Sequence, residues 1–220
     1  MILQRVRRRL VRRAQIIRRD HLDDFAFVHI NKTGGSSVER TLGLPVDHRT
    51  ALEWRDDLGP EAWERRYRFT VVRNPWDRAV SHYHYRVQTN QTSLGERKIG
   101  FREWLLRVFV ERDPAYYDQP KMFMPQLDWV SDEEGALMVD RVCRFERLSD
   151  DISEVGKVIG RPLDLPHLKA SQRGPYQSYY DDETRDVVSA WFRRDADAFG
   201  YAFDEPRPPP RRSRTPSSHA

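Results

Sequence analysis

Short apolar runs alternate with helical patterns along most of this chain. Three runs have the length and apolar character of buried strands: residues 25–30, 69–72 and 137–145. Helical sequence follows each of them, and two further amphipathic stripes complete the pattern: residues 37–42, 75–87 and 151–159, then 101–109 and 187–199. Strands that alternate with helices at these lengths predict an α/β domain with a parallel sheet.

Three residues mark the expected ends of helices. Pro75 is suited to the first position of a helix, where its missing N–H costs nothing. Asp181 can cap the start of the last helix, and Gly200 can end it. The pattern therefore predicts one helix that opens at Pro75 and a final helix that runs from Asp181 to Gly200.

Both ends of the chain differ from the middle. Apolar residues recur every three or four positions among the arginines of residues 1–20, which predicts a basic amphipathic helix. Such a helix can lean on the domain, contact a membrane surface or act as an organelle presequence, although it contains no serine. Residues 205–220 are rich in Pro, Arg and Ser and are expected to be disordered. We therefore expect a domain at residues 21–204 between two tails.

The net charge of +4 over 220 residues conceals an uneven distribution. Residues 1–20 hold eight arginines and one aspartate, and residues 205–220 hold four arginines and one glutamate, so residues 21–204 carry −6. This disfavours a nucleic-acid-binding domain. The single cysteine, Cys143, excludes an intramolecular disulfide and a cysteine-based metal cage. No apolar run approaches the ~20 residues that a membrane-spanning helix needs.

The segment that carries chemical information is residues 27–37, Phe-Val-His-Ile-Asn-Lys-Thr-Gly-Gly-Ser-Ser. It predicts a strand, a turn with two glycines and a helix start, an arrangement that turns backbone N–H groups toward an anion. Lys32 adds a full positive charge. In the P-loop of kinases the lysine follows the glycines, whereas here it precedes them, so an ATPase or GTPase is disfavoured. A plain Gly-Gly turn with a capping serine stays open as the alternative.

A second segment supports an anion site. Arg73 ends the second predicted strand, and Ser81 lies about two turns into the helix that Pro75 opens. Strand ends and the helices that follow them line the crevice in which α/β folds bind nucleotides, and the arginine fork suits a phosphate. Two anion sites on neighbouring strand ends predict a nucleotide that is anionic at both ends. The alternative for Arg73 is a surface ion pair with Asp77.

Both segments resemble the sulfotransferases that use 3′-phosphoadenosine 5′-phosphosulfate (PAPS). Residues 30–37 are similar to their 5′-phosphosulfate loop, and residues 73–81 to their 3′-phosphate motif. The resemblance covers about residues 24–204 and is closest to the carbohydrate branch with the heparan sulfate 2-O- and chondroitin enzymes, particularly its short bacterial members. Asn31 stands where that family usually has proline, and we expect it to loosen the turn without removing a ligand.

The resemblance implies a P-loop-like three-layer α/β domain that moves a sulfuryl group from PAPS to a hydroxyl or amine, with no metal. Lys32 would neutralise the leaving oxygen. The remaining donor-binding residues would be Thr33, Gly34, Gly35, Ser36, Ser37, Arg73, Ser81 and, in a loop that closes over the 3′-phosphate, Arg173. For the base, the resemblance favours His48, whose pKa near neutrality fits the role, with Glu39 as the alternative.

The expected acceptor is a carbohydrate or a small hydroxylated molecule, with no nucleic acid as partner. An acidic domain is poorly suited to a long polyanion, so a neutral or short glycan, a lipid-linked sugar or a small metabolite is predicted. We expect a bacterial cytoplasmic enzyme with peripheral membrane contact through residues 1–20. Two alternatives stay open: an ATP- and Mg²⁺-dependent phosphotransferase, and a non-catalytic anion- or membrane-binding module.

Overall fold

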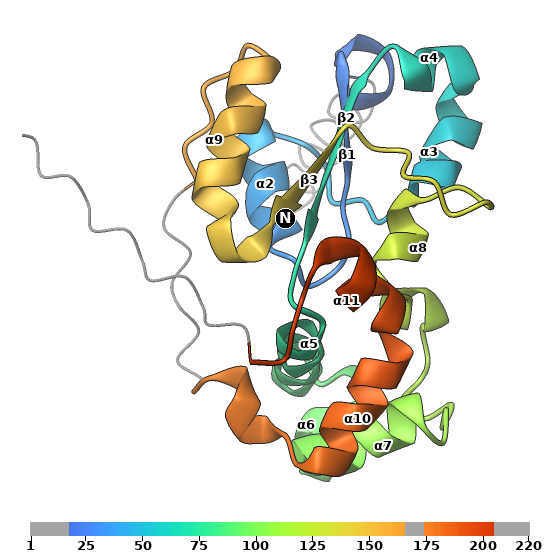
Figure 1. The fold of residues 1–220 in the computed structure, drawn as a ribbon, viewed down its shortest axis with the longest axis vertical. Coiled ribbons are helices and arrows are strands. Elements are labelled where there is room, and N and C mark those ends of the chain that lie inside the picture. Colours follow the sequence, from blue (N-terminus) through green and yellow to red (C-terminus); the bar gives the residue numbers. More distant parts are fainter. Residues whose placement is uncertain (1–17, 166–173, 205–220) are drawn as a thin grey trace, which may run out of the picture.

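Three parallel strands form the centre of the molecule (Figure 1). The computed structural model describes residues 18–165 and 174–204. Strands β1 (Phe25–Val28), β2 (Tyr67–Val72) and β3 (Arg141–Arg144) lie in the order β1-β2-β3. Phe27 pairs with Phe69, and Val71 pairs with Cys143. The predicted parallel sheet is confirmed.

Helices connect and cover the strands. The principal helices are α2 (Gly35–Leu42), α3 (Ala51–Leu58), α4 (Pro60–Glu64), α5 (Pro75–Gln88), α6 (Leu94–Arg97), α7 (Phe101–Phe109), α8 (Leu127–Val130), α9 (Leu148–Val158), α10 (Asp182–Trp191) and α11 (Arg193–Phe199). Short 3-10 turns lie at Gln91–Ser93, Pro120–Phe123, Phe145–Arg147 and Tyr176–Tyr179, and a π-helical turn lies at Arg18–Leu22.

Alternate residues of the strands enter two separate cores. Phe25 and Phe27 of β1 pack with α2 and α9, in a cluster that also contains Cys143 of β3. Ala26 and Val28 face the opposite side, toward the cluster built on α3, α5 and α7. Because successive side chains of a strand point to opposite faces, the sheet is covered on both sides. The expected three-layer α/β domain is therefore confirmed, with α2 and α9 on one face in Figure 1.

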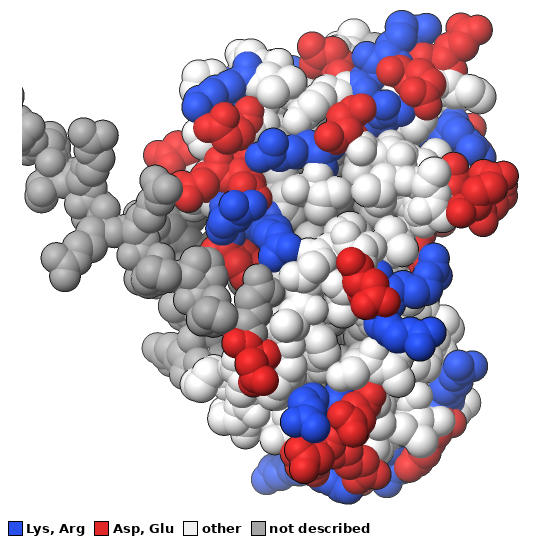
Figure 2. Space-filling view, viewed as in Figure 1, with Lys and Arg blue, Asp and Glu red and all other residues white. Residues whose placement is uncertain are grey.

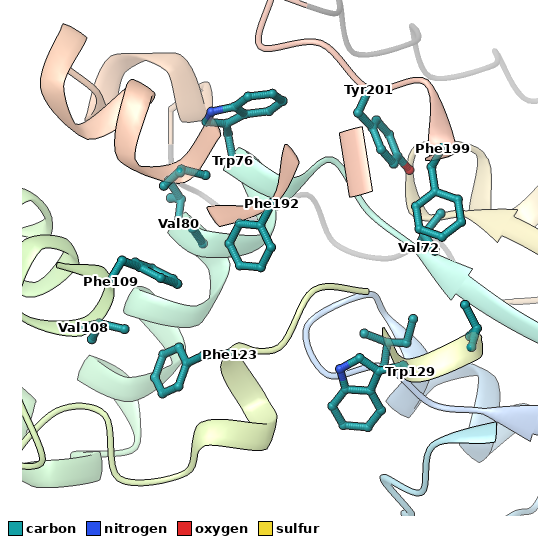
Figure 3. Close-up of a cluster of buried hydrophobic side chains, with 14 of the residues drawn as sticks. Val72, Trp76, Val80, Val108, Phe109, Phe123, Trp129, Phe192, Phe199 and Tyr201 are labelled. Carbon is teal, nitrogen blue, oxygen red and sulfur yellow. The ribbon is translucent and has the colours of Figure 1, made fainter. Parts of the chain in front are cut away.

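The larger core fixes α5 in place. Trp76 and Val80 of α5 lie among the aromatic side chains of the cluster in Figure 3. Phe109 contacts Phe123 and Phe192 edge-on, with ring centroids 5.9 and 5.6 Å apart. Burying each such side chain stabilises the fold by about 1.5–3 kcal/mol. The helix is thus a rigid support for the polar residues on its other face.

The helix ends follow the expected signals, and two segments differ. Pro75 opens α5, and Asp181 caps α10 through a reciprocal bond pair with Thr184. The predicted final helix is two helices, because the backbone leaves helical geometry at the buried residue Phe192 (φ −108°, ψ 23°). Strand β3 is shorter than predicted, because Leu137 forms an isolated antiparallel bridge to Ser131 instead.

Several predictions fall on residues that the structure does not describe. These are the amphipathic helix up to residue 17, the disordered tail at 205–220 and the position of Arg173. Among the residues that are described, no helix is long and apolar enough to cross a membrane.

Candidate functional site

The carboxyl ends of all three strands open into one cavity of about 580 Å³. Lys32 and Gly34 come from the loop after β1, Arg73 from the end of β2, and Phe145 from the residue after β3. Helix α5 supplies another wall with Ser81. This is the edge at which α/β sheets bind ligands. The residues that follow β1, β2 and β3 are far apart in the sequence, and they meet in this cavity. The two motifs predict a nucleotide site at the same edge of the sheet.

The two glycines let the first loop turn tightly into α2. Gly34 has φ +87°, and a Cβ there would come within 3.0 Å of Phe145. A Cβ on Gly35 would lie 2.0 Å from Cδ2 of His29, so the backbone of α2 packs directly on that ring. No side chain in the described ranges caps this helix start. Its first N–H groups therefore suit an anion in the cavity.

Lys32 precedes the two glycines in this loop, lines the cavity and has an uncommon backbone conformation. Its φ is +68°, in the left-handed region that few residues other than glycine adopt. Its ammonium group lies 3.9 Å from the centroid of the Tyr85 ring on α5. A cation over a ring face at this distance is attracted to it. Tyr85 therefore holds the lysine charge within the cavity.

Asn31 anchors the turn to α5. Its side-chain N–H donates to the carbonyl of Met122 over 3.0 Å, and its Oδ1 accepts from Arg78 over 2.6 Å. Arg78 is buried, which lowers its pKa to about 10. Asn31 was expected to loosen the turn relative to proline, and in the structure its side chain ties the loop to the helix through these bonds.

Arg73 connects the first two strand ends. Its Nη1 donates to the carbonyl of Lys32 over 3.0 Å, while Nε and Nη2 donate to Asp77 at 2.9 and 2.7 Å. Its guanidinium stacks 3.9 Å over the Phe145 ring. Gln126 holds the Arg73 backbone by two bonds of 2.8 Å. The pair with Asp77 is present, but the arginine is 6% exposed and lines the cavity.

Helix α5 brings a further group of polar residues to the cavity. Ser81 lines it, as do His82 and Arg86, which are 7% and 1% exposed. Burial, followed by the charge of Arg86, holds the pKa of His82 well below 6.5. Arg86 pairs with Asp118, and its Nη1 is buried without a hydrogen-bond partner in the described part of the chain.

His48 reaches the same cavity from the segment before α3. Its Nδ1 lies 3.0 Å from the carbonyl oxygen of His29. Because a carbonyl only accepts, Nδ1 carries the proton and Nε2 keeps its lone pair. Burial, and then the neighbouring His29, lower the pKa of His48 below 6.5. A neutral imidazole with an unprotonated Nε2 can act as a base.

Glu39 is buried behind the residues that line the cavity near His48. It is 2% exposed and does not line the cavity. Its Oε1 accepts from Nδ1 of His29 over 2.8 Å and from the backbone N–H of Asp47 over 2.9 Å. Of the two candidate bases, the structure brings His48 to the cavity and keeps Glu39 out of it.

Not every residue of the predicted donor loop faces the cavity. Thr33 is fully buried, and its hydroxyl donates to the carbonyl of Ile30 over 2.8 Å. Ser36 lines the cavity, whereas Ser37 does not. The expectation that the Thr33 hydroxyl contacts the donor must therefore be corrected, because that hydroxyl is used within the turn.

The cavity favours anions. Lys32, Arg73 and Arg86 line it, and none of the described residues that line it is an aspartate or glutamate. A second cavity of similar volume lies before β1 and β2, where both signs of charge line it: Asp20, Asp23, Asp24 and Asp57 together with Arg49, Arg65 and Arg66. The charged side chains that line the cavity at the carboxyl edge are thus all cationic, whereas those at the opposite edge are of both signs, so an anionic ligand is favoured at the carboxyl edge.

Some cavity residues were missed by the sequence analysis. Tyr85 and Arg86 lie outside the two motifs, Phe145 was assigned no role in the site, and His29 was absent from the expected site. A weak signal existed for two of them, because Tyr85 lies four positions after Ser81 and Arg86 four positions after His82, so each is one helical turn further along the helix. Nothing in the spacing indicates that Phe145 stacks on Arg73.

Known proteins resemble this chain in sequence family and in structure. The model of the family described as "Sulfotransferase family" matches residues 15–202. A solved sulfotransferase from Alicyclobacillus acidocaldarius is similar in structure, with a TM-score of 0.45 and 16% sequence identity, covering 82% of this chain and 96% of its own. No curated protein matches the sequence significantly.

Proposed function

Because the chain belongs to the sulfotransferase family, we propose that it transfers a sulfuryl group from PAPS to a hydroxyl or amine of a carbohydrate or small acceptor. The observation that carries the proposal is the single cavity that joins Lys32, Arg73, Ser81 and His48. No described residue lining that cavity carries a carboxylate, which suits a donor that is anionic at both ends.

The donor would lie across the ends of the first two strands. The 5′-phosphosulfate would bind at the start of α2, where Gly34 and Gly35 leave the backbone accessible. The 3′-phosphate would bind at Arg73 and Ser81, and Arg73 would exchange part of its pairing with Asp77 for it. No metal is needed for these contacts, and in the described residues no cluster of metal-ligating side chains occurs.

The reaction would be a direct displacement at sulfur. An acceptor oxygen forms the new bond to sulfur, the bond from sulfur to the 5′-phosphate oxygen breaks, and its electron pair leaves with adenosine 3′,5′-bisphosphate. Lys32 would neutralise the charge that develops on that oxygen. His48 would take the acceptor proton on Nε2, since its Nδ1 already donates to the His29 carbonyl.

The acceptor side of the cavity combines neutral polar and aromatic groups. Gln91, Gln119 and the partly exposed ring of Tyr85 line it. Amides and aromatic faces suit sugar hydroxyls and rings. Figure 2 shows acidic and basic side chains interleaved on one face of the molecule. These features support a neutral or short glycan, or a small hydroxylated acceptor, over a long polyanion.

Release of adenosine 3′,5′-bisphosphate from PAPS tests the proposal across several classes of acceptor at once. The full chain is incubated with PAPS and separate panels of neutral oligosaccharides, small alcohols and highly sulfated polysaccharide. We expect acceptor-dependent release in the first two panels and its loss in His48→Gln. Release with the polysulfated panel alone would contradict the acceptor class. Turnover of ATP–Mg²⁺ without turnover of PAPS would contradict the reaction and support a phosphotransferase.

A further inference from the structure

One buried carboxylate connects the elements on either side of His48. Oε1 of Glu39 accepts from the His29 ring, at the end of β1, and from the backbone N–H of Asp47, the residue before His48. The side chains of Glu39 and His29 are each 3% exposed. A charge-assisted hydrogen bond in such a site is stronger than one in water. The loop that carries His48 is thus tied to the strand beneath it.

His29 completes the connection. Its carbonyl accepts from Nδ1 of His48, and the two imidazole rings lie 4.3 Å apart between centroids at an angle of 44°. The bond to Glu39 fixes the orientation of the His29 ring on which His48 packs. Gly35 packs against the other part of that ring, so the ring is enclosed by α2 as well.

We infer that Glu39 is a positioning residue. By holding the His29 ring and the Asp47 backbone, it keeps Nδ1 of His48 against the His29 carbonyl, and that bond fixes the tautomer and orientation of His48. The inference rests on the proposed function, in which Nε2 of His48 receives the acceptor proton. It assigns Glu39 a role distinct from that of a base, because the carboxylate does not reach the cavity.

The neighbouring carboxylate, Asp47, does not perform this task. Its Oδ2 accepts from Arg19 and from Arg49, the latter over 2.7 Å. It therefore anchors the loop to two arginines, while its backbone N–H is the group that Glu39 holds. Glu39 is the carboxylate that holds both neighbours of His48: the His29 ring, on which His48 packs, and the backbone of Asp47, which precedes it.

Two substitutions separate positioning from proton transfer. In Glu39→Gln, the amide oxygen can still accept both bonds, and the NH₂ group takes the place of Oε2, which is buried without a partner among the described residues. Glu39→Ala removes both bonds. A glutamine cannot accept a proton as a base, so the two roles predict different behaviour for the same variant.

The first measurement is the tautomer of His48, which needs no acceptor. Long-range proton–nitrogen-15 spectra of the histidine rings are recorded on the full chain at neutral to slightly alkaline pH, with His48→Gln to assign the signal. We expect Nδ1 of His48 to be protonated in the wild type and in Glu39→Gln, and the two nitrogens to average in Glu39→Ala. Unchanged His48 shifts in Glu39→Ala, with a protein that remains folded, would overturn the inference.

The second measurement is turnover of PAPS with an acceptor found in the panels above. For a positioning residue we expect kcat to fall about 10- to 100-fold in Glu39→Ala with KM for PAPS nearly unchanged, and Glu39→Gln to retain most of kcat. Equal loss in both variants would identify Glu39 as the base. Binding of adenosine 3′,5′-bisphosphate is also measured for the wild type and for each variant. No binding by the wild type would contradict the proposed function. The tautomer of His48 would still decide whether Glu39 positions that ring.

Discussion

At the scale of single residues, Lys32 has the most direct role in the proposed reaction, because it would neutralise the charge on the leaving oxygen. Its ammonium group is held over the Tyr85 ring in the cavity, beside the loop where the donor would bind. We expect Lys32→Gln to lower kcat by about 10²–10³-fold, as when one preorganised donor is removed from a developing oxyanion. Acceptor-dependent release of adenosine 3′,5′-bisphosphate measures the effect.

Lys32→Arg is the matched control, because it keeps the charge and has the same backbone strain at φ +68°. Its kcat should lie between those of the wild type and Lys32→Gln. Equal kcat for Lys32→Gln and the wild type would show that another group neutralises the leaving oxygen.

The lowered pKa of His48 predicts how kcat depends on pH. Burial and then the neighbouring His29 lower its pKa below 6.5, while Glu39 and Asp47 oppose this more weakly. A base must be neutral, so kcat should be retained as the pH falls through 6.5 and should be lost only at the lowered pKa. The pH profile of kcat measures this midpoint. A midpoint above 6.5 would contradict the assignment of His48, as would an unchanged profile in His48→Gln.

The sequence indicated part of this site because some contacts are local. Residues 30–37 and 73–81 each belong to one strand–turn–helix unit, so their spacing alone indicated that they lie at the ends of strands. The fixing of Arg73 by Gln126 joins residues 53 positions apart. The role of Glu39 likewise depends on where His29 and Asp47 meet in space. Such contacts depend on tertiary packing, which a single sequence does not specify.

At the scale of elements, the junction between β1 and α2 depends on Gly35. Glycine is needed there because of the close contact with the His29 ring and not because of a positive φ. A Cβ at Gly35 would lie 2.0 Å from the His29 ring, so Gly35→Ala must displace a buried side chain. Alanine ordinarily stabilises a helix relative to glycine, by about 1 kcal/mol. We expect the clash to outweigh this and to lower the free energy of unfolding by about 1–3 kcal/mol.

Urea unfolding measures that change, and Gly100→Ala is its matched control. Gly100 precedes α7, and a Cβ there would meet no atom within 4 Å. Its substitution should change the free energy of unfolding by no more than about 0.5 kcal/mol. Equal stability of Gly35→Ala and the wild type would show that the ring of His29 is not fixed against α2.

The element boundaries show where periodicity is sufficient and where it fails. Capping signals at Pro75 and Asp181 depend on neighbouring backbone groups, and both are confirmed. The break at Phe192 was missed because the apolar pattern continues through it, while tertiary packing buries that ring beside Phe109. Sequence pattern reports which face is buried and not where the backbone bends.

At the scale of the whole molecule, charge is separated between the domain and its site. Residues 21–204 carry a net charge of −6, yet the described residues lining the cavity include three cations and no carboxylate. Net charge therefore describes the surface, on which both signs interleave in Figure 2, and not the site. The three-stranded sheet accounts for this separation by bringing the ends of its strands to one edge.

Calorimetric titration of the full chain with adenosine 3′,5′-bisphosphate measures whether the cavity at the strand ends binds the nucleotide that sulfuryl transfer leaves. Loss of a charged hydrogen bond to phosphate costs about 1.5–3 kcal/mol, so Arg73→Ala should weaken binding roughly ten- to a hundredfold. Arg102→Ala, which removes an arginine paired with Asp181 outside the cavity, should bind as the wild type does. We expect tight binding that requires the 3′-phosphate and Arg73. Equal affinity for 5′-AMP, or an unchanged affinity in Arg73→Ala, would contradict it.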